Sequence, residues 1–132
     1  MFNNEIDWIN PKECLEAVKR DGFMIMFVEN QTEGLCIEAV KQNGYAIQHI
    51  EKQTPKICME AIKQCGYVLQ FVKQQTPEMC MEAIKQIGTI LYHVKEKTYE
   101  LCLEAIKKDK DAIQYVPKNF QEIHEIWKIL YD

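Results

Sequence analysis

A period of 22 residues constrains this chain more than any other feature of its sequence. Five of its six cysteines are spaced by that interval: Cys14, Cys36, Cys58, Cys80 and Cys102. A glutamate follows two positions after each of these cysteines, then an alanine, and a lysine two positions later. Five copies in fixed register, without an insertion, predict a repeat protein built from one short supersecondary unit.

The period divides the chain into five repeats and two caps, which we predict to form a single repeat domain over residues 1–132. The repeats occupy residues 10–31, 32–53, 54–75, 76–97 and 98–119. An N-terminal cap (1–9) precedes them, and a C-terminal capping helix (120–132) follows. Asn119 begins an Asn-Phe-Gln-Glu segment that is typical of a capping box at the start of that helix.

Each repeat is predicted to fold as two short helices. Residues with N-cap preference stand at one position of the frame: Asn10, Thr32, Thr54, Thr76 and Thr98. A helix of about ten residues is expected to follow and to end where glycine recurs, at positions 22, 44, 66 and 88. We expect these glycines to be left-handed C′ residues. A second, shorter helix with apolar residues three positions apart completes the unit, which predicts an all-α solenoid of five helix–turn–helix repeats.

The fifth repeat departs from this frame. Lys110 replaces the glycine, and Asp111 replaces the residue that follows it, which is aromatic in the first three repeats. A residue with a side chain is disfavoured in a left-handed conformation. Either this turn differs from the others, or the first helix of the repeat runs on.

The regularly spaced cysteines predict small buried residues rather than a chemical site. Equivalent positions in stacked helices lie about 8–10 Å apart, whereas a disulfide needs Cα atoms within about 7 Å. The sequence has no C-x-x-C pair of the kind that often supplies zinc ligands. Cys65 lies outside the regular spacing, and we expect it to be partly exposed. We therefore predict no catalytic residue, no cofactor and no metal site.

Charge and hydropathy exclude several classes of protein. The net charge is −4 with a pI of about 5.4, so the chain lacks the basic surface on which nucleic-acid binding depends. The same balance disfavours attraction to anionic membranes. No apolar run approaches the roughly 20 residues of a membrane span, and the first ten residues do not resemble a signal peptide. An intracellular, cytoplasmic location is expected.

The repeat frame resembles a family of short tandem helical repeats of unknown function that occurs in bacteria, protists and giant DNA viruses. The segment from Ala39 to Ile47, AVKQNGYAI, is similar to the motif of that family. The resemblance covers residues 10–119. It implies an α-solenoid and supplies no catalytic residue, and it admits a viral source, for which the location would be the host cytoplasm.

Two neighbouring positions of the second helix are the candidates for contact with a partner. One position carries Gln48, Gln70, Tyr92 and Gln114, and the next carries His49 and His93 where other repeats have Phe or Tyr. Aromatic side chains are enriched in binding hot spots. Since the second position accepts any flat ring, packing between repeats explains the rings better than binding does, and the glutamines are the stronger candidates.

The architecture favours a non-catalytic protein-interaction or scaffold module, because solenoids offer long repeated surfaces to partners. Its partner would be another protein or peptide rather than nucleic acid or membrane, and the chain itself a monomer or weak homo-oligomer. The alternative is a self-assembling structural protein, such as an orphan of a viral genome. A thiol- or metal-dependent enzyme is a remote third reading.

Overall fold

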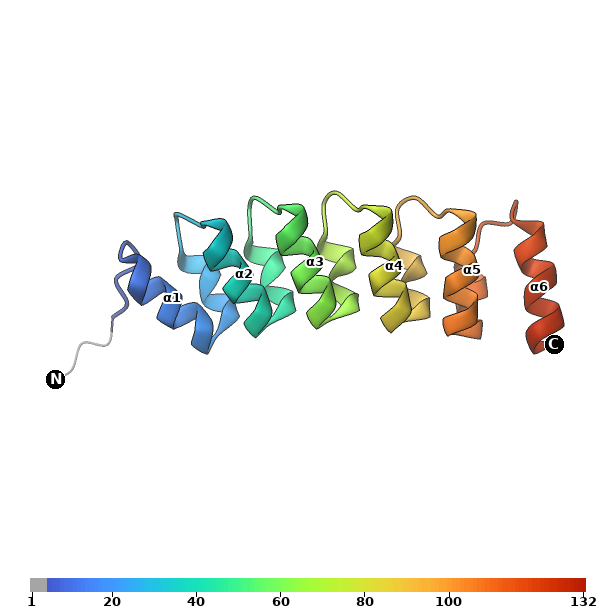
Figure 1. Ribbon diagram of the computed structural model, residues 1–132, viewed down its shortest axis with the longest axis horizontal. Helices are drawn as coiled ribbons and strands as arrows, with labels where there is room; N and C mark the ends of the chain where they lie inside the picture. Colours follow the sequence, from blue (N-terminus) through green and yellow to red (C-terminus); the bar gives the residue numbers. More distant parts are fainter. Residues whose placement is uncertain (1–4) are drawn as a thin grey trace. The chain divides into compact units, whose positions relative to one another are not determined.

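Every regular element in residues 5–132, the part of the chain that this computed structural model describes, is a helix (Figure 1). Long and short helices alternate. Five α-helices of ten residues begin the repeats: α1 (Pro11–Arg20), α2 (Glu33–Gln42), α3 (Pro55–Gln64), α4 (Pro77–Gln86) and α5 (Tyr99–Lys108). A last α-helix, α6 (Gln121–Tyr131), follows them. The predicted all-α repeat fold is confirmed.

The second helix of each repeat is a 3-10 helix of six residues. These are η1 (Gly22–Phe27), η2 (Gly44–His49), η3 (Gly66–Phe71), η4 (Gly88–His93) and η5 (Lys110–Tyr115). The sequence pattern predicted a short helix here but not its type. A 3-10 helix rises about 2 Å per residue, so six residues nearly match the length of the ten-residue α-helix beside them.

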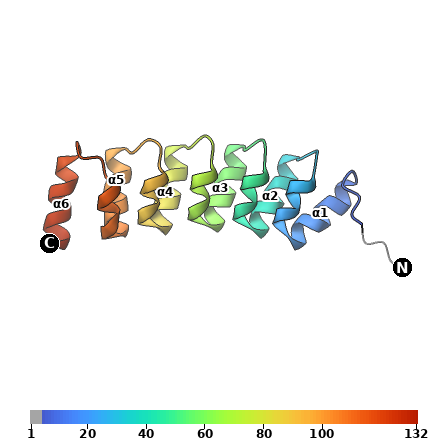
Figure 2. The ribbon, with the colours of Figure 1, turned by 180° about the vertical axis from the view of Figure 1, so that it is seen from behind.

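The chain forms two compact units, Met1–Gln64 and Cys65–Asp132. In the first unit, α1, α2 and α3 lie side by side, and η1 and η2 form a second layer behind them (Figure 1). In the second unit, α4, α5 and α6 pack in succession, with η3, η4 and η5 behind. Figure 2 shows the two layers from the opposite side. Within the units, η1, η2, η4 and η5 each contact the α-helix of their own repeat and the α-helix that follows, and η3 contacts α4.

The helix starts are those that the sequence predicted. Asn10 Oδ1 accepts from the backbone N–H of Lys12 at 2.9 Å. The threonine Oγ1 at the same position of the other repeats accepts from the N–H three residues on, at 3.2–3.3 Å. These bonds satisfy N–H groups that have no partner within the helix, and the predicted N-caps are confirmed.

The role predicted for the glycines is wrong. No residue among 5–132 has a positive φ, and the residue that ends each α-helix is the extended one before the glycine position, such as Asp21 with φ −148°. The glycine is instead the first residue of the 3-10 helix. A Cβ on Gly88 would lie 2.6 Å from the carbonyl oxygen of Ala105, in the next repeat. Glycine is present because the following helix leaves no room for a side chain.

This contact also explains why the fifth repeat tolerates Lys110. The helix α5 ends at Lys108, like its counterparts in other repeats, and η5 begins at Lys110. The turn is therefore unchanged and the helix does not run on, so neither alternative expected from the sequence holds. The next element is the cap α6, in which Trp127 donates its indole N–H to the Lys110 carbonyl at 2.7 Å.

The predicted capping box at Asn119 is wrong in its details. The N-cap of α6 is Phe120, and no side chain caps this helix. Packing fixes α6 instead: Ile123 is fully buried, and the Tyr131 hydroxyl donates to the carbonyl of Ile106 at 2.8 Å. Within residues 5–132 no helix is long and apolar enough to cross a membrane.

The two helical glycine positions give a matched test of this packing. We expect Gly88→Ala to lower the free energy of unfolding by about 1–3 kcal/mol, because the added methyl overlaps a backbone carbonyl of the next repeat. Gly34→Ala places its methyl in open space and should raise stability by about 0.5–1 kcal/mol. Urea denaturation followed by circular dichroism measures both. Equal effects of the two substitutions on the free energy of unfolding would contradict the close packing of Gly88 against the next repeat.

Candidate functional site

The predicted glutamine row lies on the exposed side of the 3-10 helices. Gln48, Gln70 and Gln114 are exposed, and Tyr92 keeps 63% of its surface accessible. Each glutamine folds its amide back onto its own helix: the Nε2 atoms donate to the carbonyl three residues earlier, at 3.0–3.2 Å. In the second unit, Gln70, Tyr92 and Gln114 occupy one position on the packed helices η3, η4 and η5. We call these three residues the 3-10 row.

The histidines beside the glutamine row each contact a neighbouring ring. His49 lies half-buried against Phe23 of the preceding repeat, with ring centroids 5.7 Å apart. His93 meets Tyr92 edge-on at 4.9 Å, and Tyr92 meets Tyr115 of the next repeat at 5.2 Å. These are ordinary distances for aromatic pairs. The two histidines contribute to packing, and Tyr92 combines contacts to two rings with an exposed fraction of 63%.

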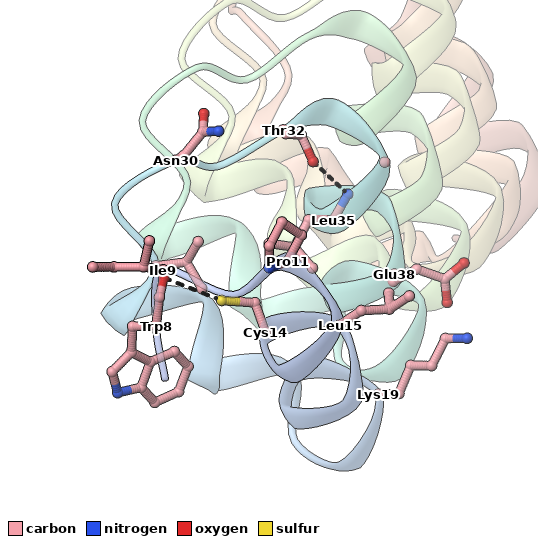
Figure 3. Close-up of a pocket in the computed structure, with 12 residues that line it drawn as sticks. Trp8, Ile9, Pro11, Cys14, Leu15, Lys19, Asn30, Thr32, Leu35 and Glu38 are labelled. Atoms are coloured by element: carbon pink, nitrogen blue, oxygen red, sulfur yellow. Dashed lines mark hydrogen bonds between the residues drawn. The ribbon is translucent and has the colours of Figure 1, made fainter. Parts of the chain in front are cut away.

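In the first unit a groove lies between α1 and α2 (Figure 3). Its volume is about 410 Å³. Cys14, Leu15 and Leu35 supply apolar surface, and Trp8 and Ile9 of the N-terminal cap complete the lining. Other lining residues are Pro11, Val28, Asn30, Thr32 and Gly34. The side chains of Lys19 and Glu38 lie near one another at one edge (Figure 3).

The corresponding groove between α4 and α5 is smaller, at about 170 Å³. Several lining residues are equivalent, three periods apart: Gln75 to Ile9, Pro77 to Pro11, Cys80 to Cys14, Glu96 to Asn30, Thr98 to Thr32 and Leu101 to Leu35. Two differences in the residues accompany the larger volume of the first groove. Gly34 stands where repeat five has Glu100, and Ile9 stands where Gln75 crosses to the next repeat. In both ribbon views α1 is also inclined to α2 (Figures 1 and 2).

The regularly spaced cysteines are buried, as predicted, and Cys65 is half-buried. Burial raises the pKa of the Cys36 thiol to about 11, with a smaller contribution from Glu33, and raises that of Cys102 to about 11. A thiol is nucleophilic as its thiolate, so burial lowers the thiolate fraction, and with it the reactivity, of both side chains. Within residues 5–132 no three His, Cys, Asp or Glu side chains are placed to hold a metal ion.

Comparison with protein families gives one match, repeated along the chain. The family described as domain of unknown function DUF4116 matches residues 32–76, 55–98 and 76–121. Each match covers two successive repeats, and together they span residues 32–121. The chain belongs to this family. No curated protein and no solved structure matched the chain.

The DUF4116 repeats are joined by a hydrogen-bonding residue that sequence reasoning missed. Gln75 stands just before an N-cap threonine and reaches the next repeat, where its Nε2 donates to the His93 carbonyl at 2.9 Å and its Oε1 accepts from Lys95 N–H at 2.9 Å. Gln31 does the same toward His49 and Glu51. The recurrence of glutamine at 31, 53 and 75 was the available signal.

A second glutamine joins the DUF4116 repeats in the opposite direction. Gln86 Oε1 accepts from the N–H of Gly66, in the preceding repeat, at 2.8 Å. Gln42 accepts from Gly22 at 2.5 Å and donates to the Arg20 carbonyl at 3.3 Å. The N–H of each of these two glycines is thereby satisfied although it lies at a helix end, where no backbone partner exists.

Two glutamines of the second unit allow the bridging role to be tested, because one bridges repeats and the other is exposed. We expect Gln75→Ala to lower the free energy of unfolding by about 1–3 kcal/mol, because it leaves backbone groups of two repeats without partners. Gln70→Ala, on the exposed row, should change it by no more than about 0.5 kcal/mol. Urea denaturation provides the comparison, and a neutral Gln75→Ala would refute the bridging role.

Thiol burial predicts a loss of stability at alkaline pH. An unfolded cysteine ionises at its ordinary pKa of 9.0, whereas Cys36 in the folded chain ionises at about 11. Its contribution is therefore complete below pH 9 and lost as the pH rises toward 11. The free energy of unfolding should fall less steeply between pH 8 and pH 10.5 in Cys36→Ala than in the wild type, both measured under reducing conditions. Parallel curves would contradict this expectation.

Proposed function

We propose that this chain is a non-catalytic protein-interaction module. The observation that carries the proposal is the 3-10 row, in which two amides and a tyrosine repeat at one exposed position of three packed helices. Stacked repeats commonly use such a surface to bind an extended partner, because each repeat offers one contact and the contacts follow in register.

Tyr92 is the expected centre of that surface. Its side chain is 63% exposed, and rings on both sides hold it, His93 within its own helix and Tyr115 in the next repeat. A held tyrosine loses little side-chain entropy on binding and presents both an apolar ring and a hydroxyl. Gln70 and Gln114 flank it with amide groups that suit the backbone of a peptide.

The proposal extends to the compartment. Five of the six thiols are buried and all six are free, which suits a reducing compartment such as the cytoplasm. The net charge of −4 favours a protein or peptide as the partner over nucleic acid.

The test is capture of a partner by the full chain from lysate of its source cells, followed by a binding measurement with the purified partner. The variant Gln70→Ala/Tyr92→Ala/Gln114→Ala should bind at least roughly 30-fold more weakly, the effect of losing one hot-spot residue. All three side chains are exposed, so the variant should unfold at the wild-type urea concentration.

The matched control is Lys85→Ala/Lys107→Ala, which removes two exposed side chains from the α-helices of the same unit. This variant should keep the wild-type affinity. A partner lost equally from both variants would move the site away from the 3-10 row, and a wild-type chain that captures no partner would refute the proposal.

A further inference from the structure

The groove between α1 and α2 breaks the pattern of the repeat at two points, and no contact within residues 5–132 accounts for either break. Gly34 lies in the first turn of a helix, where glycine is less stable than alanine by roughly 0.5–1 kcal/mol. A Cβ at this position meets nothing within 4 Å, so packing does not require glycine. The equivalent residues of the other repeats are Lys12, Lys56, Glu78 and Glu100.

Ile9 is the second break. Its side chain is 89% exposed, although the next repeats carry glutamine at this position and use it to bridge repeats. An isoleucine cannot make those bonds, and its exposure leaves apolar surface in water beside a groove with apolar walls. Exposing one isoleucine to water costs little free energy, but Ile9 and Gly34 line the same groove.

The end of α6 carries exposed apolar side chains of its own. Ile129 is 82% exposed, Leu130 53% and Tyr131 39%. Ile129 lies away from the face that the buried Ile123 anchors, Leu130 extends that face at its exposed end, and Tyr131 is held by its hydrogen bond to the carbonyl of Ile106. Lys128 and Asp132 flank them in sequence, while Lys19 and Glu38 stand at the edge of the groove. Each surface therefore offers one charge of each sign beside an apolar centre.

We propose that the groove receives the end of α6 from a second copy of this chain. Ile129 and Leu130 would enter between α1 and α2, with Lys128 meeting Glu38 and Asp132 meeting Lys19. The volume of about 410 Å³ lies within the range of roughly 300–1,000 Å³ found for pockets that enclose a ligand. The space that Gly34 leaves open is the space that these side chains need.

Such a contact joins two different surfaces, so every copy keeps one groove and one helix end free. Association of this kind continues from copy to copy unless the geometry closes a ring. It shares no residue with the 3-10 row, and it stands or falls independently of the proposed binding to another protein.

The test is sedimentation of the full chain over a concentration series from about 10 µM to about 1 mM. The weight-average mass of the wild type should rise from 15.6 kDa past that of a dimer. Gly34→Lys fills the groove with the residue found at the same position of repeat three, and Ile129→Lys places a charge on the apolar end. Each variant alone should remain a monomer over the whole range.

Mixing the two variants decides whether the surfaces meet each other. Gly34→Lys retains a helix end and Ile129→Lys retains a groove, so an equimolar mixture should form a dimer and grow no further. Glu100→Lys, at the equivalent position of repeat five, is the matched control and should associate like the wild type.

A wild-type chain that stays monomeric at about 1 mM would overturn the proposal and leave the groove to a foreign peptide or small molecule. So would a mixture that forms no dimer, or a Gly34→Lys variant that associates like the wild type. Urea denaturation of both variants confirms that they fold, and we expect Gly34→Lys to be at least as stable as the wild type.

Discussion

The close approach of a glycine to the carbonyl of an alanine in the next repeat sets the spacing within each unit. At Gly22, Gly66 and Gly88 a Cβ would come within 3.1 Å or less of that carbonyl oxygen, so the 3-10 helix of one repeat lies directly against the α-helix of the following one. The same alanine carbonyl accepts from the extended residue that ends its own helix, at 2.9 Å for Ala39 and Ala105. Since this contact joins two fixed positions of the frame, a change in repeat length would break it. An invariant period of 22 residues follows.

The sequence allowed the repeat, the helix starts and the buried positions to be predicted, because each depends on local residue preference. Thr32 and its equivalents cap a helix wherever an apolar period follows, and the regular spacing of the cysteines indicated their burial. The role of the glycines was mistaken because glycine has two uses, a left-handed turn or a close approach, and only the neighbouring repeat distinguishes them. The 3-10 geometry and the bridging glutamines also depend on the neighbour. Asn119 matched a capping motif, yet no side chain caps α6. The place of this helix is fixed instead by the hydrogen bonds that Trp127 and Tyr131 make to the fifth repeat.

The two candidate surfaces, the glutamine row and the groove, also differ in how far the sequence could predict them. Exposure of Gln48, Gln70 and Gln114 could be inferred from their position on a short amphipathic helix, whereas the groove could not, since it arises from what the first repeat lacks. Departures from a repeat are informative for this reason. Lys110 departs where the next element is a cap, and it has a structural explanation. Ile9 and Gly34 depart where the next element is an ordinary repeat, and nothing within residues 5–132 explains either departure.

The bridging glutamines have a consequence for how this protein lengthens and folds. Their bonds connect residues 18 to 22 positions apart, so none reaches beyond the adjacent repeat. A gene duplication that adds one whole repeat would recreate each of these bonds with a new neighbour and disturb no other. Contacts of such short sequence separation also close small loops, which favours rapid folding. Growth by duplication therefore needs no compensating change elsewhere in the chain.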